Sequence, residues 1–367
     1  MDCFRLARFN IYKLKYFTQD VKPWMHFFQG LFILDVKSLR GTTVSDDHGD
    51  IMSLVNSRLP LPLIYAGVRQ ILKNRMPADN MFICLTEGEG LRFPYYIDEY
   101  KSEDTLDIFP KEGWTGYVID LQSRYWLRKD PAPPPGISPV GHISKDWLGV
   151  PLMDRDGSTF GVLAVQTYEP GSYYTEEDER FMQFTASALS VAIQLARQDA
   201  DIAVRRIAAL VDDIVDLDEL YPRIHQILQT VIPAARKNIV FARIDADAGL
   251  FLPVYWMDER EGYQAIDWPL DQGFSGYICT VSGKSFIFEK EKTKIPPEVI
   301  PIVAIPLYWL GAPLYSQNRI IGIVFIQSYN ANTIITREDE YVLNSICPYI
   351  AEAISHTELF NLKLRKS

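Results

Sequence analysis

The chain has 367 residues, enough for two domains of ordinary size, and its 47% apolar and 23% charged residues are typical of a globular protein. The net charge of −10 disfavours nucleic acid or an anionic membrane as a partner. The longest apolar stretch, residues 300–315, is interrupted by prolines and is shorter than the roughly 20 residues of a spanning helix. The start of the chain lacks the pattern of a secretion signal, so we expect a cytoplasmic protein with reduced cysteines.

Residues 1–47 differ in character from the rest of the chain. This segment is basic where the remainder is acidic, and its aromatic residues follow neither the helix nor the strand period. We interpret it as an N-terminal arm, either loosely attached or an upstream extension translated from a misplaced start. We therefore expect the rest of the chain to fold without it.

Most of the remaining sequence contains the same elements twice, in the same order and about 160 residues apart. The period exceeds the roughly 20–50 residues of a solenoid unit, so each copy is expected to be a complete domain. The paired segments are residues 95–99 and 255–259, 113–117 and 273–277, 147–152 and 309–314, 166–168 and 327–329, and 175–179 and 336–340.

Each copy begins with the same predicted elements. A helix over residues 54–73, or 218–231 in the second copy, has apolar residues at three- and four-residue spacing. A strand follows at residues 81–85 or 239–244, and the next strand ends in a Tyr–aromatic–x–Asp–Glu element. A Gly–x–Thr/Ser–Gly–Tyr element then opens a short helix, because glycine and hydroxyl residues suit a helix start.

Each copy closes with a proline-rich loop and two strands. The loops, residues 130–136 and 294–297, contain too many prolines for a helix interior or a central strand. The last strands are almost continuously apolar, so both of their faces should be covered. This order predicts an antiparallel sheet with helices packed on it and a pocket under the proline-rich loop. The closing strands are predicted at residues 148–152 and 160–168, and at 304–307 or slightly later and 320–329.

A long helix is predicted to begin at Thr175, where a hydroxyl cap and a run of acids suit a helix N-terminus. No proline or glycine follows until Pro222, so one helix of some forty residues should join the two copies. Apolar residues at alternating three- and four-residue steps predict a helix-mediated homodimer. The predicted dimer seam contains Phe184, Ala188, Val191, Leu195 and Ile202, and resumes at Ile207, Leu210, Ile214 and Leu217.

Two further points concern these helices. As an alternative to the dimer seam, residues 181–191 would pack on their own sheet. The closing helix, from residue 338 to about residue 364, has the same apolar spacing, and Pro348 is predicted to kink it.

The repeated elements resemble GAF domains, in particular those upstream of bacterial sensor histidine kinases and related two-component proteins. The resemblance is carried by the repeated elements above, with Trp-Leu-Gly-Val-Pro-Leu at residues 147–152 as the most specific, and it covers residues 53–197 and 204–360. It implies an α+β fold in which each domain has a central antiparallel sheet of about six strands with flanking helices. The expected organisation is the arm 1–47, a GAF domain at 50–197, a connecting helix at 198–217, and a second GAF domain with the C-terminal helix at 218–367.

The resemblance implies a small-molecule sensor or a purely structural regulatory domain, since GAF domains bind cyclic nucleotides, bilins, haem or metabolites, or nothing. Cyclic-nucleotide binding is disfavoured because Thr167 and Ser328 stand where those members have a lysine. Covalent bilin is not expected, since no cysteine of this chain is followed by histidine. The isolated histidines and scattered cysteines also predict no metal site, so the cofactor stays open.

Aromatic and amide residues of the repeated elements are the candidate ligand-binding residues, because such side chains combine contact area with a directed hydrogen bond. The alternative is that the aromatic rings are core residues and the glutamines fasten strand ends. The candidates are Tyr96, Tyr117, Trp147 and Gln166 in the first copy and Trp256, Tyr277, Trp309 and Gln327 in the second.

The sequence contains no kinase, cyclase, phosphodiesterase or hydrolase motif. We therefore expect a non-enzymatic signalling module in which a small molecule biases the connecting helices of a homodimer. A signalling partner such as a histidine kinase is expected, and neither nucleic acid nor membrane. One alternative is a ligand-free interaction scaffold, or the sensory part of a system whose histidine kinase is separate. Another is an enzyme like the free methionine sulfoxide reductases, which would need pocket cysteines.

Overall fold

The computed structural model describes residues 47–57, 59–100, 108–213, 216–260, 265–290, 292–300 and 305–364. The predicted N-terminal arm lies outside these residues, except for Asp47, and so does Ile214 of the predicted seam. Within the described ranges, no helix combines the length and the apolar character of a transmembrane span.

The first half of the described chain forms a six-stranded antiparallel sheet with the order β3-β2-β1-β6-β5-β4. Strands β1 and β6 are central, and both are almost fully buried, as their apolar sequences predict. The elements are α2 (Asp47–Val55), α3 (Leu61–Lys73), β1 (Asn80–Glu87), β2 (Gly90–Ile97), β3 (Phe109–Pro110), α4 (Gly113–Leu121), β4 (Tyr125–Trp126), β5 (Asp146–Met153) and β6 (Thr159–Thr167).

The second half repeats this sheet, with the order β10-β11-β12-β7-β8-β9. Each strand pairs with the equivalents of the neighbours that its counterpart has in the first half, so the predicted duplication extends to strand topology. The elements are α6 (Leu217–Val231), η2 (Pro233–Lys237), β7 (Ile239–Asp245), β8 (Leu250–Met257), β9 (Trp268–Pro269), α7 (Gly273–Tyr277), η3 (Ile278–Ser282), β10 (Phe286–Glu289), β11 (Tyr308–Ser316), β12 (Arg319–Ser328) and α8 (Arg337–Leu364).

Both halves are joined by α5 (Glu176–Asp213), an uninterrupted helix of 38 residues that confirms the predicted long helix. Thr175 and Asp178 cap its start reciprocally: the Thr175 amide donates to the Asp178 carboxylate at 2.8 Å, and the Asp178 amide donates to the Thr175 hydroxyl at 3.2 Å. The fold is thus α+β, with two six-stranded antiparallel sheets, flanking helices and a long helix between them.

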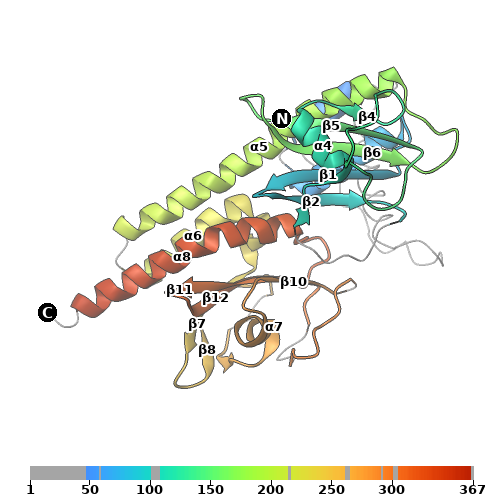
Figure 1. Ribbon diagram of the computed structural model, residues 1–367. Helices are drawn as coiled ribbons and strands as arrows, with labels where there is room; N and C mark the ends of the chain where they lie inside the picture. Colours follow the sequence, from blue (N-terminus) through green and yellow to red (C-terminus); the bar gives the residue numbers. More distant parts are fainter. Residues whose placement is uncertain are drawn as a thin grey trace, which may run out of the picture. The chain divides into compact units, whose positions relative to one another are not determined.

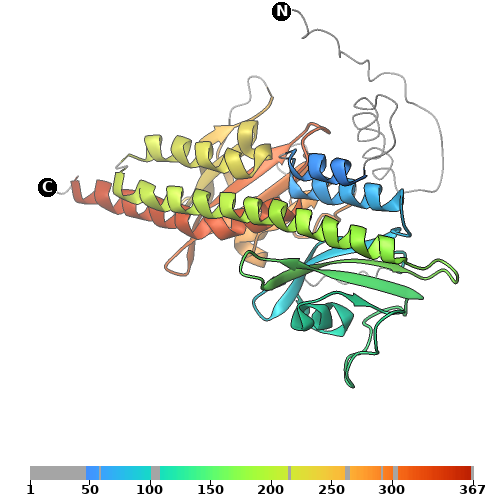
Figure 2. The same ribbon diagram turned by 90° about the horizontal axis from the view of Figure 1, so that it is seen from above.

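Each sheet lies between helices. In the first half, α4 contacts β5 and β6 on one face, whereas α5 contacts β5 and β6 on the other, and Figure 2 shows α4 (teal) and α5 (yellow-green) on opposite sides of the sheet. In the second half, α6 and α8 pack with β7, β11 and β12 into one apolar core. Both faces of the central strands are therefore covered, as predicted.

One predicted element was wrong in extent, and another begins at the later of its expected positions. The helix expected over residues 54–73 is two helices: α2 ends at Val55, and α3 begins at Leu61 with Pro60 as its N-cap residue and Pro62 in its first turn. The strand expected at residues 304–307 or slightly later is β11, which begins at Tyr308, so the Trp–Leu–Gly element is itself part of a strand in both halves.

The short helices α4 and α7 begin where predicted, each on a glycine in the left-handed region, Gly113 with φ 66° and Gly273 with φ 69°. The residues before them, Glu112 and Gln272, make no capping hydrogen bond with their side chains. The hydroxyl of Ser275 instead accepts a hydrogen bond from the Trp268 indole at 2.9 Å, inside the second half. The same hydroxyl donates to the carbonyl of Gln272 at 3.4 Å, so it joins a buried ring to the start of α7.

The long helix packs differently along its length. Its first half contacts α2, α3 and β5, whereas Ala203 and Ile207 are buried in the core formed with α6 and α8. Figures 1 and 2 both show α5 running beside α8. The predicted continuation of the seam at Ile207, Leu210 and Leu217 therefore packs against helices of the same chain. Helix α8 continues through Pro348, and the predicted kink stays a prediction.

The residues of the predicted dimer seam divide into two groups. Ala188 is buried, and Phe184 is half-buried against His48. Val191, Leu195 and Ile202 are 56%, 48% and 39% exposed. The alternative that residues 181–191 pack on their own half therefore agrees with the burial of Ala188 but not with the exposure of Val191.

Candidate ligand-binding and signalling sites

An aromatic cluster fills the α4 side of the first sheet and contains three of the four candidate residues of that half. Trp147 is 2% exposed, and Tyr96 and Tyr117 pack at the margin of the same cluster. The Trp147 ring lies so close to Gly149 that a Cβ there would come within 2.1 Å of it. The Trp–x–Gly spacing is therefore a packing device, in which the glycine admits the indole.

The second half has an equivalent cluster around Trp309. A Cβ on Gly311 would come within 2.2 Å of the Trp309 ring, and Tyr277 packs edge-on against Phe286 in the same cluster. Trp256 lies outside it and is 39% exposed. The structure thus brings Tyr277 and Trp309 together but not Trp256.

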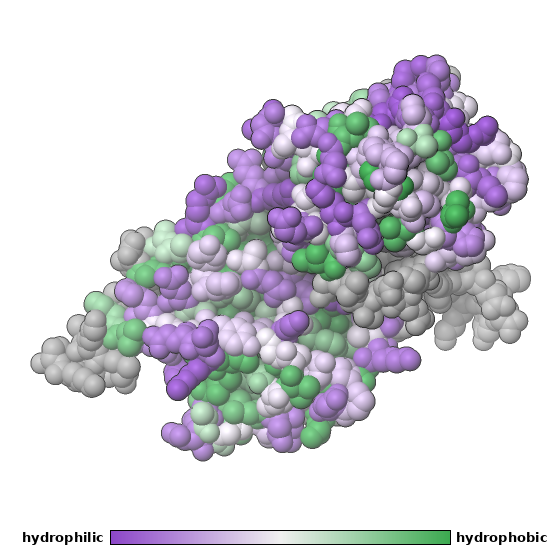
Figure 3. Space-filling view, in the orientation of Figure 1, coloured by the Kyte–Doolittle hydropathy of each residue, from purple (hydrophilic) through white to green (hydrophobic). Residues whose placement is uncertain are grey.

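The rings occupy the face where the sequence predicted a pocket. Two cavities among the described residues, of about 560 and 240 Å³, both lie in the second half, and neither is lined by any of the eight candidate residues. Figure 3 shows polar and apolar residues mixed over the visible face, with apolar residues gathered over the lower part, which belongs to the second half. The packing agrees with the alternative that the indoles are core residues.

The two candidate glutamines fasten strand ends. The amide of Gln166 donates to the Asp98 carboxylate, and the Gln327 amide donates to Asp258 at 3.3 Å. Each contact ties the last strand of a sheet to the Asp of the Tyr–aromatic–x–Asp–Glu element. These contacts agree with the alternative to ligand binding, in which the glutamines fasten strand ends.

A second contact at the same strand ends is also duplicated. The backbone amide of Glu99 donates to the side-chain oxygen of Asn80 at 2.9 Å, and the Glu259 amide donates to Asn238 at 3.1 Å. Both asparagines are buried and immediately precede or begin a central strand. Sequence reasoning missed them, although an asparagine stands at the same place in both copies.

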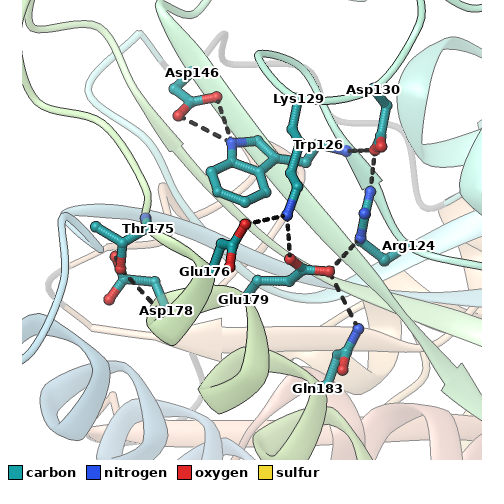
Figure 4. A network of polar contacts seen from close by, with 10 residues as sticks. All are labelled: Arg124, Trp126, Lys129, Asp130, Asp146, Thr175, Glu176, Asp178, Glu179 and Gln183. Carbon is teal, nitrogen blue, oxygen red and sulfur yellow. Dashed lines mark hydrogen bonds and ion pairs between the residues drawn. The ribbon is translucent and has the colours of Figure 1, made fainter.

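A charged network that was not predicted from the sequence links the proline-rich loop to the start of α5 (Figure 4). Arg124, just before β4, contacts both Asp130 and Glu179. Lys129 donates to Glu176 at 2.9 Å and lies 3.6 Å from Glu179. Glu179 is only 13% exposed, so its charge is held mainly by these two cations.

The buried Asp146 anchors the same region from the sheet. Its carboxylate accepts from the Trp126 indole at 3.1 Å, from the Trp147 amide at 3.0 Å and from the Tyr174 amide at 3.1 Å. Burial raises the pKa of Asp146, while these three donors act in the opposite direction. Together they fix β4, β5 and the segment that leads into α5 relative to one another.

The equivalent link in the second half is smaller. Glu340 occupies the position of Glu179 and accepts from the Ser285 hydroxyl at 2.9 Å and from Arg337, its neighbour on α8, at 2.6 Å. A neutral hydroxyl thus takes the place of Arg124 and Lys129. The loop-to-helix contact is therefore charged in one half and largely local in the other.

The cysteines in the described part of the chain lack the features of reactive thiols. Burial raises the pKa of Cys84 and of Cys279 to about 12, which disfavours the thiolate that redox chemistry needs. Within the described ranges, no group of three metal-binding side chains gathers at one place. His225 is instead a structural residue: its Nε2 donates to the Ala235 carbonyl at 3.0 Å, and its Nδ1 accepts from the Tyr255 hydroxyl at 2.7 Å.

The chain is similar to several solved structures. The GAF domain of an Acinetobacter phosphoenolpyruvate-protein phosphotransferase is 22% identical, with 42% of this chain and 93% of that chain covered and a TM-score of 0.35. The GAF domain of the corresponding Coxiella burnetii protein is 16% identical, with 45% and 98% covered and a TM-score of 0.36. The free methionine-R-sulfoxide reductase from Neisseria meningitidis in complex with its substrate is 14% identical, with 44% and 90% covered and a TM-score of 0.35.

The comparison with curated proteins gives no match. The family model of the GAF domain matches residues 64–194. This range runs from α3 through the whole first sheet into α5, and it contains the Trp147 cluster and the charged network described above. Residues 64–194 of this chain therefore form a GAF domain.

Proposed function

We propose that the chain is a non-enzymatic regulatory protein of two GAF domains, in which the state of the first is passed to the second through α5. GAF domains are sensory and regulatory modules, and the second half repeats the sheet order, the Trp–x–Gly packing and the strand-end contacts of the first. The observation that carries the proposal is that one helix belongs to both halves. The first turn of α5 is bound by the charged network, and Ala203 and Ile207 in its second half are buried in the second core.

The network gives the first domain a way to act on α5. A ligand or partner that displaces the proline-rich loop would pull on Asp130, and through Arg124 on Glu179 in the first turn of the helix. A helix turn that loses its ion pairs shifts the balance between two packings rather than performing chemistry. Aromatic rings pack closely on the α4 side of the first sheet and on the α7 side of the second, and this packing supports the ligand-free scaffold as a second candidate function.

The proposed assembly is a homodimer through the exposed stripe of α5. Val191, Leu195 and Ile202 lie on one side of the helix, and their exposed fractions leave them available to a second copy. A signalling partner such as a histidine kinase would read the geometry of the paired helices. The raised pKa values of the cysteine thiols support the absence of redox catalysis.

Transmission is tested by hydrogen exchange on the full chain carrying Glu179→Gln. Removing the charge should speed exchange in the loop and also in residues 203–211 and in α6, which pack together. The matched control is Glu89→Gln, at an exposed turn. A change confined to the loop and the first turn of α5 would sink the proposed transmission.

Dimerisation is tested by analytical ultracentrifugation of Leu195→Asp/Ile202→Asp. Two aspartates in an apolar seam should convert the dimer to a monomer, because each would be buried without a partner. The control is Ile266→Asp/Val281→Asp, which changes two exposed apolar residues of the second half and should leave the dimer intact. A dimer that persists in the α5 variant would place the interface elsewhere.

A further inference from the structure

The larger cavity, of about 560 Å³, lies at the end of the second sheet where β8 and β12 end and β7 begins. It is distinct from the aromatic cluster on the α7 side. Its walls are the 3₁₀ helix η2, the residues that follow β8 and the residues that follow β12. The lining residues that bear on its chemistry are Arg236, Lys237, Asn238, Glu259, Arg260 and Asn330.

Three cations line this cavity in a protein of net charge −10. Arg236 and Lys237 are exposed, and neither makes an ion pair with another residue in the described part of the chain. Arg260 is held in a fork by Asp258, with its Nε 2.8 Å from one carboxylate oxygen and a terminal nitrogen 2.7 Å from the other. Its guanidinium also lies 4.0 Å from the centre of the Tyr329 ring.

Glu259, the acidic residue in the cavity wall, is hydrogen-bonded to neighbouring residues of the same chain. Glu259 accepts from the Ser328 hydroxyl at 2.8 Å, from the Tyr329 amide at 2.7 Å and from the Asn238 amide at 3.3 Å. Its charge is therefore stabilised by neutral internal donors and remains in the wall, but no ion pair between described residues joins it to Arg236 or Lys237. With Arg260 paired to Asp258, the cations Arg236 and Lys237 outnumber Glu259 by one, which leaves a small excess of positive charge for a ligand.

The first half shows how this site arises. In both halves a helix residue holds a carbonyl just before the central strand: Arg69 donates to the Asp79 carbonyl at 2.7 Å, and His225 to that of Ala235 at 3.0 Å. In the first half Asn80 follows Asp79 directly. In the second, Arg236 and Lys237 are inserted between Ala235 and Asn238, so the insertion itself supplies two of the three cations.

The equivalent place in the first half differs in charge and in filling. Asp79 stands next to the asparagine and pairs with Lys73. Tyr100 replaces Arg260 and stacks on His142 with ring centres 4.0 Å apart, and both rings contact Tyr168. Aromatic rings thus occupy the region that is a cation-lined cavity in the second half.

We propose that the cavity at η2 binds a small oxyanion, through Arg236 and Lys237 with Arg260 fixed beside them. Phosphate and carboxylate groups share the required chemistry, because both accept several hydrogen bonds from cationic donors. The cavity volume lies within the range of small-metabolite sites. The inference goes beyond the proposed function, since it gives the second half a ligand site of its own that needs neither the α4-side face nor α5.

The test is isothermal titration calorimetry of the full chain with two probes, inorganic pyrophosphate and citrate, in a buffer without phosphate. At least one probe should bind, and the tighter one identifies the oxyanion class. Affinity should fall by about tenfold or more in Arg236→Ala/Lys237→Ala, because two charge-assisted contacts are lost. Binding should also weaken as salt increases from 20 to 200 mM, to an extent of severalfold.

The matched control is Lys284→Ala/Lys294→Ala, which removes two exposed cations of the same half that do not line the cavity. This variant should bind within about twofold of the unchanged chain. Equal loss in both variants would show non-specific attraction to positive charge and overturn the proposal. Binding of neither probe, or unchanged binding in the cavity variant, would overturn it as well. Since binding is measured directly, either result leaves the proposed transmission through α5 unaffected.

Discussion

The two halves of the molecule share their strand order and their internal packing but differ at the two places where loops meet helices. Each half packs a tryptophan over a glycine, joins a glutamine to an aspartate, and holds a glutamate amide with an asparagine. The link from loop to long helix is charged only in the first half, and the cation-lined cavity lies in the second. Duplication has therefore kept the residues that fix the sheet, while the contacts at its ends have diverged.

The largest expected effect tests the shared part. Trp147→Ala and Trp309→Ala should each reduce the free energy of unfolding by about 3–5 kcal/mol, because each removes a buried ring that covers a glycine. Urea denaturation followed by circular dichroism measures the loss. The exposed Trp256 is the control, and its replacement by alanine should cost less than about 1 kcal/mol. If only one of the two replacements reduced the free energy of unfolding, the two halves would not share this Trp–Gly packing.

A middle-sized effect tests the divergent link. Glu179→Gln should cost about 1–3 kcal/mol, because Arg124 and Lys129 both lose a carboxylate that is largely shielded from water. Glu340→Gln should cost less than about 1 kcal/mol, since a glutamine oxygen can still accept from the Ser285 hydroxyl. Equilibrium unfolding of both variants measures the difference. Equal losses would contradict the view that the first half has the stronger loop-to-helix contact.

The smallest expected effect concerns pH. Burial lowers the pKa of His225 below its ordinary 6.5, so the unfolded chain binds a proton more readily than the folded chain does. The stabilisation from neutral His225 is therefore complete above pH 6.5 and is lost as the pH falls below that value. The loss cannot exceed about 1.4 kcal/mol per pH unit for one proton.

Denaturation at a series of pH values from 5 to 7.5 measures this dependence. His225→Gln should flatten the pH profile, whereas the first half has Arg69 at the equivalent position and no histidine to titrate. An unchanged slope in the variant would show that other groups cause the pH dependence.

The duplication made the fold predictable from the sequence. The repeated elements fixed two sheets, and the absence of proline and glycine after Thr175 predicted the long helix, because local sequence decides both. Pro60 was a visible signal for two helices that the apolar spacing of residues 54–73 obscured. The position of β11 could also have been predicted from the sequence, since aligning Trp309 with Trp147 places the strand on that element.

The sites were less predictable. The contact between Arg124 and Glu179 joins residues far apart in the sequence, and neither belongs to a motif that indicates pairing. Aromatic residues of the repeated elements could equally line a pocket or fill a core, and only the packing distinguishes the two. The insertion of Arg236 and Lys237 could have been found by aligning the segments before Asn80 and Asn238, which have different lengths.

Because α5 is uninterrupted, the number of residues in it sets the rotation of the second half relative to the first. An α-helix turns about 100° and rises about 1.5 Å per residue, so one residue inserted between Leu195 and Ala203 would rotate Ile207 by that angle relative to the first half. A seven-residue insertion would nearly restore the angle and only lengthen the helix. The helical phase of this segment, rather than the identity of its exposed side chains, therefore sets which faces of the two halves meet.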